Sequence, residues 1–333
     1  MMNKRLKQGT TFLLALALAF PLLTLPGARA ANAIETDRKC SVSFSVSGEG
    51  NELTATGTDI KVNLYKVADV DVSGNYTATE DFKKLDVSSV SADNNAAANT
   101  WAARAKEAQK LLKDSVNPTA TVTLAAGTRS LADLATGLYL VDTPEVVTTN
   151  YTYTFTPYLV SLPTNNYYSN GNDTWIYDLT KEYNSAVGLK PEEHARYGDL
   201  KINKTLAHHN ATTGKKATFV FQIEITPLKS NKTETRIESL DFEAAGDSSV
   251  TITKIPAGAA VTVKEVYSGA SYKLISANDQ TTKIIATDEK GAPVSVSFTN
   301  DVDDNMNGGY GVKNNFKLDE NSQYQYTEPA EKN

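Results

Sequence analysis

Alternation of apolar and polar residues is the main pattern in the second half of the chain. The runs 199–206, 261–265 and 294–300 alternate with the period of a half-buried strand. Within these runs Lys204, Glu265 and Asn300 stand where an isolated charge or carboxamide is costly to bury. If the strands share a sheet or lie in facing sheets, the three side chains can meet.

The first half of the chain shows strand patterns interrupted by one helix. We predict strands at 41–46, 60–67, 119–124, 137–142 and 151–162. Residues 96–113 are rich in Ala, Lys, Leu and Glu and predict a helix, with Trp101 and Leu111 or Leu112 on its packing face. This pattern indicates an elaborated β sandwich with one inserted helix.

The length of the chain suits two domains of ordinary size. Pro, Gly and charged residues cluster at 189–198, between two strand-rich stretches. The fold class we predict is all-β, with two tandem immunoglobulin-like sandwiches. The predicted parts are a signal peptide at 1–30, a first domain at 34–190, a linker at 191–197, a second domain at 198–300 and an acidic tail at 301–333.

The first thirty residues have the three-part layout of a secretory signal. Lys4, Arg5 and Lys7 precede an apolar run at 12–25, and Ala28 and Ala30 supply the small residues of a cleavage site. The run is broken by proline and is short for a bilayer span of about 20 residues. We therefore expect a secreted or cell-surface protein without a membrane span in its mature form.

Net charge and cysteine content argue against a nucleic-acid partner, an intramolecular disulfide and a lipid anchor. Loss of the signal's four cations takes the net charge from −6 to about −10, which argues against a nucleic-acid partner. Cys40 is the only cysteine, so no intramolecular disulfide can form, although export would permit one. It lies too far beyond the signal for a lipid anchor. Internal amide crosslinks would stabilise such a chain without redox chemistry.

A Lys amine, a carboxyl group and a carboxamide form a reactive set when apolar side chains enclose them. Burial disfavours the charged forms of Lys204 and Glu265, which leaves a neutral amine as nucleophile and a protonated acid that can polarise the Asn300 carbonyl. Attack then expels ammonia and leaves an amide crosslink. Well-oriented intramolecular reactions reach effective molarities of roughly 10⁵–10⁸ M. We predict that no cofactor, metal or external enzyme is needed.

The second domain resembles the collagen-adhesin B-type (Cna-B-like) domains of Gram-positive surface proteins and sortase-assembled pilins. The resemblance covers residues 198–300, through the segments 198–204, 254–265 and 298–300. It implies that Lys204 and Asn300 are the bonded pair and that Glu265 is the catalytic acid. Lys201 is the alternative nucleophile, but strand residues an odd number of positions apart face opposite sides, so only one of the two lysines points inward.

The first domain resembles the amino-terminal domain of a fimbrial (pilin) shaft subunit. The resemblance is carried by Val62-Asn-Leu-Tyr-Lys-Val67, Leu134-Ala-Thr-Gly-Leu-Tyr-Leu140, the segment 153–163 and Trp175-Ile-Tyr-Asp178. In such subunits a Lys near the end of the domain attacks the sortase acyl-enzyme of the next subunit, which joins subunits head to tail. Lys190 occupies that place and is the acceptor that the resemblance implies. Lys181 is the alternative.

The carboxyl end departs from this family. A sortase donor needs a Leu-Pro-x-Thr-Gly-like motif, an apolar span and a basic tail, and residues 328–333 contain none of them. The internal Leu162-Pro-Thr-Asn165 has the pattern of a strand that ends in a turn. We therefore expect a subunit that accepts a partner but does not donate itself: a tip or accessory component, a secreted relative, or a truncated gene product.

The acidic tail allows two interpretations. Residues 301–309 have the spaced acids of a calcium loop, but Met306 and Val312 stand where a turn glycine and a bidentate glutamate are required. We therefore expect no metal site there. The runs 311–318 and 323–327 instead predict a hairpin that pairs with an edge strand.

The function that we predict is a structural subunit of a cell-surface pilus, associated with the cell wall, whose partners are other pilin subunits and a sortase. An enzyme is disfavoured, because His194, His208 and His209 form no catalytic triad or zinc spacing with the distant cysteine. The alternative is an adhesin that binds host glycan or matrix through aromatic residues of the first domain. Those residues are Tyr167, Tyr168, Trp175 and Tyr177.

Overall fold

The computed structural model describes residues 32–46, 52–55, 58–92, 96–112, 116–125, 128–166, 172–180, 187–210, 216–269, 271–287, 291–303, 315–318 and 324–327. They form two compact units, which divide between Ala195 and Arg196. The predicted signal peptide, residues 1–30, lies outside this described part of the chain. Within the described part, no helix is long and apolar enough to cross a membrane.

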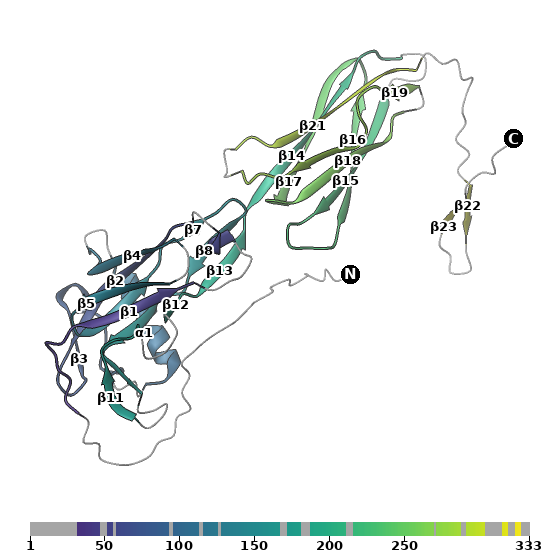
Figure 1. The fold of residues 1–333 in the computed structure, drawn as a ribbon. Helices are drawn as coiled ribbons and strands as arrows, with labels where there is room; N and C mark the ends of the chain where they lie inside the picture. Colours follow the sequence, from purple (N-terminus) through teal and green to yellow (C-terminus); the bar gives the residue numbers. More distant parts are fainter. Residues whose placement is uncertain are drawn as a thin grey trace. The chain divides into compact units, whose positions relative to one another are not determined.

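The first unit is built mainly from β strands, coloured purple to teal in Figure 1. Its strands are β1 (Cys40–Ser45), β2 (Ile60–Val70), β3 (Tyr76–Ala78), β4 (Ala120–Leu124), β5 (Thr128–Leu134), β6 (Gly137–Asp142), β7 (Val146–Val147), β8 (Tyr151–Phe155), β9 (Tyr158–Leu162), β10 (Thr164–Asn166), β11 (Asn172–Ile176), β12 (Val187–Gly188) and β13 (Pro191–Ala195). The strand orders are β12–β1–β5, β3–β2–β6–β9, β13–β8–β7 and β10–β11, and β4 also pairs with β2. Short 3-10 turns lie at Glu52–Thr54 and Glu80–Phe82.

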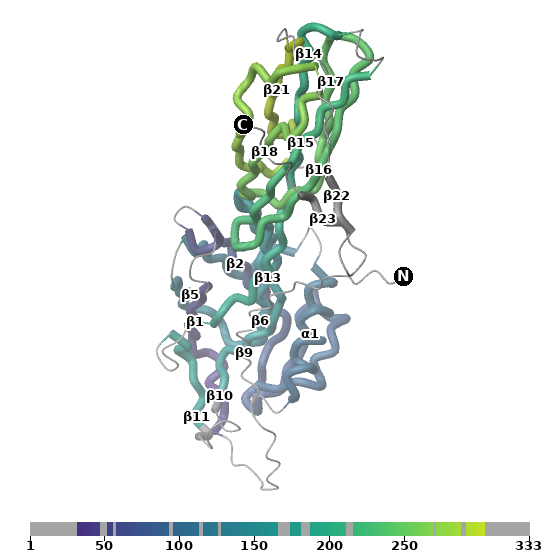
Figure 2. Tube along the Cα trace, turned by 90° about the vertical axis from the view of Figure 1, so that its right-hand side faces the viewer, coloured from purple at the N-terminus to yellow at the C-terminus, as the bar shows by residue number. Residues whose placement is uncertain are grey.

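One α-helix, α1 (Ala98–Leu111), packs against β6 and β9 of the first unit (Figure 2). Ala105 and Ala108 are fully buried, and their short side chains allow the helix to approach the sheet closely. Trp101, Leu111 and Leu112 pack against the same core while partly exposed. The helix predicted at 96–113 and its packing face are therefore confirmed.

The strand predicted at 151–162 is in fact two strands in different sheets. β8 pairs with β7 and β13, whereas β9 pairs with β6. Pro157 lies between them and has no backbone N–H to donate to a ladder, so the chain leaves one sheet there and enters the next. The apolar and polar residues alternate on both sides of this break, which is why the pattern alone did not show it.

Residues 191–195 of the predicted linker 191–197 form strand β13, and the division between the two units falls inside that linker, between Ala195 and Arg196. This strand pairs along its whole length with β8, from Pro191 opposite Phe155 to Ala195 opposite Tyr151. Its side chains are mostly exposed, as the charged composition indicated. An edge strand can carry charged side chains and can begin with proline, so the composition did not distinguish it from a linker.

The second unit is a sandwich of two four-stranded sheets, coloured green to yellow in Figure 1. Its strands are β14 (Tyr197–Leu206), β15 (Ala217–Thr226), β16 (Glu234–Phe242), β17 (Gly246–Pro256), β18 (Ala260–Tyr267), β19 (Tyr272–Leu274), β20 (Gln280–Lys283) and β21 (Val294–Val302). The sheets have the orders β17–β14–β21–β19 and β16–β15–β18–β20. The predicted fold class, all-β with an inserted helix in the first unit, is confirmed.

The first and last strands of this sandwich, β14 and β21, are parallel neighbours. Lys204 lies opposite Phe298, and Leu206 lies opposite Asn300. Along β14 and β15 every second residue is buried, as expected for strands with one face on a core. The core between the sheets includes Phe219 and Phe221.

In the tail, β22 (Asn315–Leu318) and β23 (Tyr324–Thr327) form an antiparallel pair, so the predicted hairpin is present. Among the described residues these two strands pair with each other, and no edge strand joins them. Most of the segment weighed as a calcium loop, residues 304–309, lies outside the described residues.

Candidate functional site

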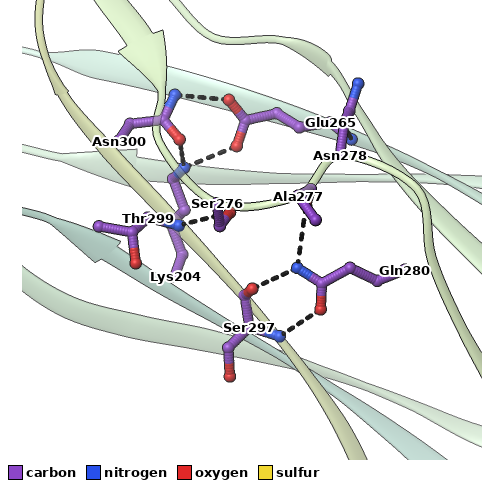
Figure 3. Close-up of polar contacts among 9 residues, drawn as sticks. All are labelled: Lys204, Glu265, Ser276, Ala277, Asn278, Gln280, Ser297, Thr299 and Asn300. Carbon is purple, nitrogen blue, oxygen red and sulfur yellow. Dashed lines mark hydrogen bonds and ion pairs between the residues drawn. The ribbon is translucent and has the colours of Figure 1, made fainter.

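Three strands of the second unit direct the predicted side chains into one interior. β14 places Lys204 on the same face as Leu200 and Ile202, because residues an even number of positions apart share a face. β21, its parallel neighbour, buries Asn300. β18 lies in the facing sheet and turns Glu265 toward them. The structure thus brings all three residues together, as Figure 3 shows.

The three side chains form a closed set of contacts. Lys204 Nζ donates a hydrogen bond to Glu265 Oε2 at 2.6 Å and another to Asn300 Oδ1. Asn300 Nδ2 donates to Glu265 Oε1 at 2.5 Å. Each oxygen of the carboxyl group therefore accepts one hydrogen bond, one from the amine and one from the amide nitrogen.

The site is dry and lined by aromatic rings. The side chains of Lys204 and Glu265 are 0% exposed, and Asn300 is also fully buried. Lys204 Nζ lies 4.4 Å from the centroid of the Phe219 ring and 5.9 Å from that of Phe221. The face of an aromatic ring attracts a cation, but it does not replace the water that a charged amine loses on burial.

Burial lowers the pKa of the Lys204 amine, because desolvation penalises its charged form. The hydrogen bond and the negative charge of Glu265 act in the opposite direction and raise it, but the desolvation effect is larger. The neutral, nucleophilic form of Lys204 is therefore easier to reach than that of an exposed lysine. This is the electrostatic property that an amine nucleophile requires.

The contact made by Glu265 differs from the one expected. We predicted that a protonated Glu265 would polarise the Asn300 carbonyl, but Asn300 Oδ1 accepts its hydrogen bond from Lys204 instead. Glu265 contacts the amide nitrogen, because its two oxygens lie between Lys204 Nζ and Asn300 Nδ2. In this position the carboxyl group can exchange a proton with both nitrogens.

Two other residues lie near the site: Lys201 on the opposite face of β14, and Asn278 in contact with the backbone of Glu265. Lys201, the alternative nucleophile, lies three positions before Lys204 on β14, so it is on the opposite face and partly exposed. Asn278, which the sequence analysis missed, accepts a hydrogen bond at Oδ1 from the backbone N–H of Glu265 at 2.7 Å. In the sequence, residues 276–280 have the composition of an ordinary polar turn, so only the structure gives Asn278 a role.

Lys190 lies in the first unit, between β12 and β13, and its side chain is exposed. Its backbone carbonyl accepts a hydrogen bond from Thr156 N at 3.2 Å. The lysine is therefore accessible to another protein while its backbone is held. Lys181, the alternative acceptor, lies outside the described residues.

The aromatic residues of the alternative sugar-binding face are not exposed where the structure describes them. Trp175 and Tyr177 are only 8% and 5% exposed. The Tyr177 hydroxyl accepts a hydrogen bond from Glu35 N at 2.7 Å, and the Arg38 guanidinium lies 4.2 Å from its ring centroid. These two residues belong to the core of the first unit. Tyr167 and Tyr168 lie outside the described residues.

Two of the three histidines make separate polar contacts, and the third packs beside an aromatic ring. His194 Nε2 is 3.0 Å from Thr154 Oγ1, and His208 Nδ1 is 2.9 Å from Asp301 Oδ1. The His209 ring lies near that of Tyr272, with 6.5 Å between the ring centroids. In the part of the chain that the structure describes, no three His, Cys, Asp or Glu side chains group together as a metal site.

Comparison with known proteins gives one family match and several similar structures. A family described as a domain of unknown function (DUF5979) matches residues 200–303, the sandwich that contains the site. No curated protein matches the chain.

Solved structures similar to the chain include pilins of Gram-positive bacteria. The major pilin T3.2 of Streptococcus pyogenes has 12% identity and a TM-score of 0.26, over 80% of this chain and 99% of that one. The shaft pilin SpaA of Lactobacillus rhamnosus GG has 12% identity and a TM-score of 0.26, over 80% of this chain and 98% of that one. The full-length major pilin SpaD of Corynebacterium diphtheriae has 14% identity and a TM-score of 0.29, over 77% of this chain and 68% of that one.

Proposed function

We propose that the chain is an exported structural subunit of a cell-surface pilus, and that an isopeptide bond between Lys204 Nζ and Asn300 Cγ closes its second unit. The mutual contact of Lys204, Glu265 and Asn300 inside an apolar core carries this proposal. A buried ion pair has a desolvation cost that apolar residues of similar size would avoid. Chemistry that needs these three groups accounts for their burial.

The contacts support a reaction in which Glu265 moves protons between two nitrogens. Lys204 Nζ gives one proton to Glu265 Oε2 and, as a neutral amine, attacks Asn300 Cγ. The Nζ–Cγ bond forms, the Cγ–Nδ2 bond breaks, and Nδ2 takes a proton from Glu265 Oε1 and leaves as ammonia. A second proton from Nζ returns to Glu265. The products are a secondary amide, ammonia and a neutral carboxylic acid, whose lack of charge suits its burial.

The enclosure of the site favours the reaction, because it holds the reacting groups together. The nucleophile, the proton carrier and the carboxamide are held in contact before the reaction begins. Such preorganisation is equivalent to an effective concentration of roughly 10⁵–10⁸ M. No cofactor enters any step of this scheme.

The crosslink would join parallel neighbours at the two ends of the sandwich. Lys204 and Asn300 are 96 positions apart in the chain, so the bond closes nearly the whole sandwich, from β14 to β21, into one covalent loop. By the chain-entropy estimate used for disulfides, a loop of this size stabilises the folded state by about 4–5 kcal/mol. The second unit would thus acquire a covalent constraint that the lone cysteine cannot provide.

In the same proposal, Lys190 is the acceptor through which a sortase joins this chain to another subunit. Its exposed side chain on a held backbone supports this role. The pilus assignment rests on the residues of the first unit that resemble pilin shaft subunits. Incubation with a sortase and a peptide that carries a Leu-Pro-x-Thr-Gly-like motif tests this part. We expect wild type to be labelled and Lys190→Arg to stay unlabelled, and equal labelling of the two would exclude Lys190.

Intact-mass spectrometry of the full chain tests the crosslink. We expect the wild type to be lighter than its sequence by one ammonia, whereas Lys204→Ala, Asn300→Ala and Glu265→Ala have the masses of their sequences. Lys201→Ala is the matched control, because it removes a lysine from the other face of the same strand, and it should stay lighter by one ammonia. A wild type at its full sequence mass contradicts the proposal.

A further inference from the structure

Residues 275–280, which we call the strap, connect β19 in one sheet to β20 in the other. Figure 3 shows Ser276 of the strap beside Thr299, Asn278 beside Glu265, and Gln280 beside Ser297. The strap is therefore a covalent connection between the sheet that carries Lys204 and Asn300 and the sheet that carries Glu265. The chemistry described above does not use any strap residue directly.

On one side, strap residues continue the hydrogen bonding of β21 beyond the end of β19. β19 pairs with β21 as far as Leu274, which lies opposite Asn300. Past that point the backbone N–H of Thr299 donates to Ser276 Oγ at 3.1 Å, and the N–H of Ser297 donates to Gln280 Oε1 at 3.0 Å. Gln280 Nε2 also donates to the Ser297 carbonyl. The side chains of the strap thus hold the strand that presents Asn300.

On the other side, Asn278 continues the ladder between β18 and β20. The last backbone pair of that ladder is Val263 opposite Gln280. Two positions farther along β18, the N–H of Glu265 meets Asn278 Oδ1 at 2.7 Å in place of a backbone carbonyl. Glu265 is only 5% exposed, so without Asn278 a buried N–H would lose its partner, which is costly.

We propose that the strap positions the reactive groups for crosslink formation, and that Asn278 is its main positioning residue. Asn278 holds the backbone of Glu265 where the carboxyl group reaches both Lys204 Nζ and Asn300 Nδ2. It touches no reacting atom and acts through Glu265. This inference rests on the proposed isopeptide function. Displacement of a catalytic group by about 1 Å can slow a reaction on the order of 10²-fold.

The rate of ammonia loss after synthesis tests the strap. The full chain is made in a short pulse at low temperature, and samples are denatured at intervals for intact-mass measurement. We expect Asn278→Ala to crosslink at least about tenfold more slowly than wild type. Asn278→Asp keeps an acceptor oxygen at the same place and should restore most of the rate. Rates are compared below the unfolding temperature of each variant, which circular dichroism gives.

Asn231→Ala is the matched control, because Asn231 is exposed in the loop between β15 and β16 and makes no contact with the site residues in the described structure. It should crosslink at the wild-type rate. Slowing by Asn231→Ala equal to that by Asn278→Ala would indicate a general loss of stability and overturn the inference. If Asn278→Asp slows the reaction as severely as Asn278→Ala does, the inference is also overturned.

The experiment distinguishes a wrong strap inference from a wrong crosslink proposal. If wild type loses ammonia and Asn278→Ala loses it equally fast, the strap inference is wrong and the crosslink stands. If wild type loses no ammonia, the proposed function itself is wrong. Should Asn278→Ala not fold, Ser276→Ala replaces it, because that change removes the hydroxyl that accepts the Thr299 N–H. An unchanged rate in that variant also overturns the inference.

Discussion

The two units of the chain bury different kinds of polar group. In the described part of the first unit the buried polar residues are the uncharged Ser43, Asn63, Thr136, Thr143, Ser161 and Asn165. In the described part of the second unit they are Lys204, Glu265 and Asn300. The first unit follows the usual rule that buried polar groups are neutral, whereas the second gathers its buried charge into one site. In the proposed function this buried charge serves a reaction and not packing.

The two units also differ in what holds them together. The first packs a helix and several sheets around a large apolar core, which includes the fully buried Cys40. The second is a single sandwich with a smaller core around the reactive residues. A covalent bond between Lys204 and Asn300 would therefore matter most where the apolar core is smaller.

Removal of the crosslink should have the largest effect and should separate the two units. The double variant Lys204→Met/Glu265→Gln cannot form the bond and leaves no unpaired buried charge. We expect the free energy of unfolding of the second unit to fall by about 4–5 kcal/mol, since the unfolded chain is no longer closed into a loop. Calorimetry should show this as a lower unfolding temperature for one transition only. Lys201→Met is the control, and equal shifts of both transitions would contradict the account.

The pH dependence of unfolding in an uncrosslinked variant tests the effect of the buried charge in the second unit. Asn300→Ala keeps Lys204 and Glu265 but cannot react. Because burial lowers the pKa of Lys204, the unfolded chain binds more protons than the folded chain between that lowered pKa and the usual value of about 10.4. The free energy of unfolding of the second unit should therefore rise with pH in this window, while below it the cost of burying the amine is fully present.

Urea unfolding at a series of pH values measures this effect. The double variant Lys204→Met/Asn300→Ala is the control, because it retains every other titrating group of the second unit. We expect the free energy of unfolding of Asn300→Ala, taken relative to that of the double variant, to rise as the pH rises toward about 10.4. A relative value that stays constant or falls would show that burial does not disfavour the charged amine of Lys204.

Thiol labelling probes the first unit separately. Cys40 is fully buried, and burial raises the pKa of its thiol to about 11, so at neutral pH the group is both protonated and shielded. We expect alkylation to proceed only through opening of the first unit, and much more slowly than in the unfolded chain. Loss of the crosslink should leave the labelling rate unchanged. Faster labelling in Lys204→Met/Glu265→Gln would show that the two units are not independent in stability.

Replacement of the proposed acceptor should have the smallest effect on stability. Lys190 is exposed, so Lys190→Arg should change the unfolding free energy of either unit by less than about 0.5 kcal/mol. The loss of ammonia should also be unchanged. A clear shift of the first transition would indicate a structural role for this side chain, and calorimetry with intact mass measures both properties.

Much of the site could be predicted from the sequence because strand periodicity determines which side chains face inward. The even spacing from Leu200 and Ile202 to Lys204 placed the amine in the core and Lys201 outside it. Helix α1 was predictable from composition, because helix propensity also depends on the residues of the segment itself. Such properties depend on neighbours in the chain, which the sequence displays directly.

What the sequence did not show depends on partners far away in the chain. Asn278 can contact the backbone of Glu265 only because the strap brings it beside β18. The atoms that Glu265 contacts depend on how two facing sheets are set against each other. Residues 191–195 form a strand because β8 offers them an open edge, although their own composition is that of a linker.

Sequencing of proteolytic peptides by tandem mass spectrometry tests the central claim most directly. The account predicts one branched peptide in which Lys204 is joined to Asn300 and which is lighter by one ammonia than its two parts together. Two linear peptides with an unmodified Lys204 and an intact Asn300, recovered in full yield from folded protein, would contradict it.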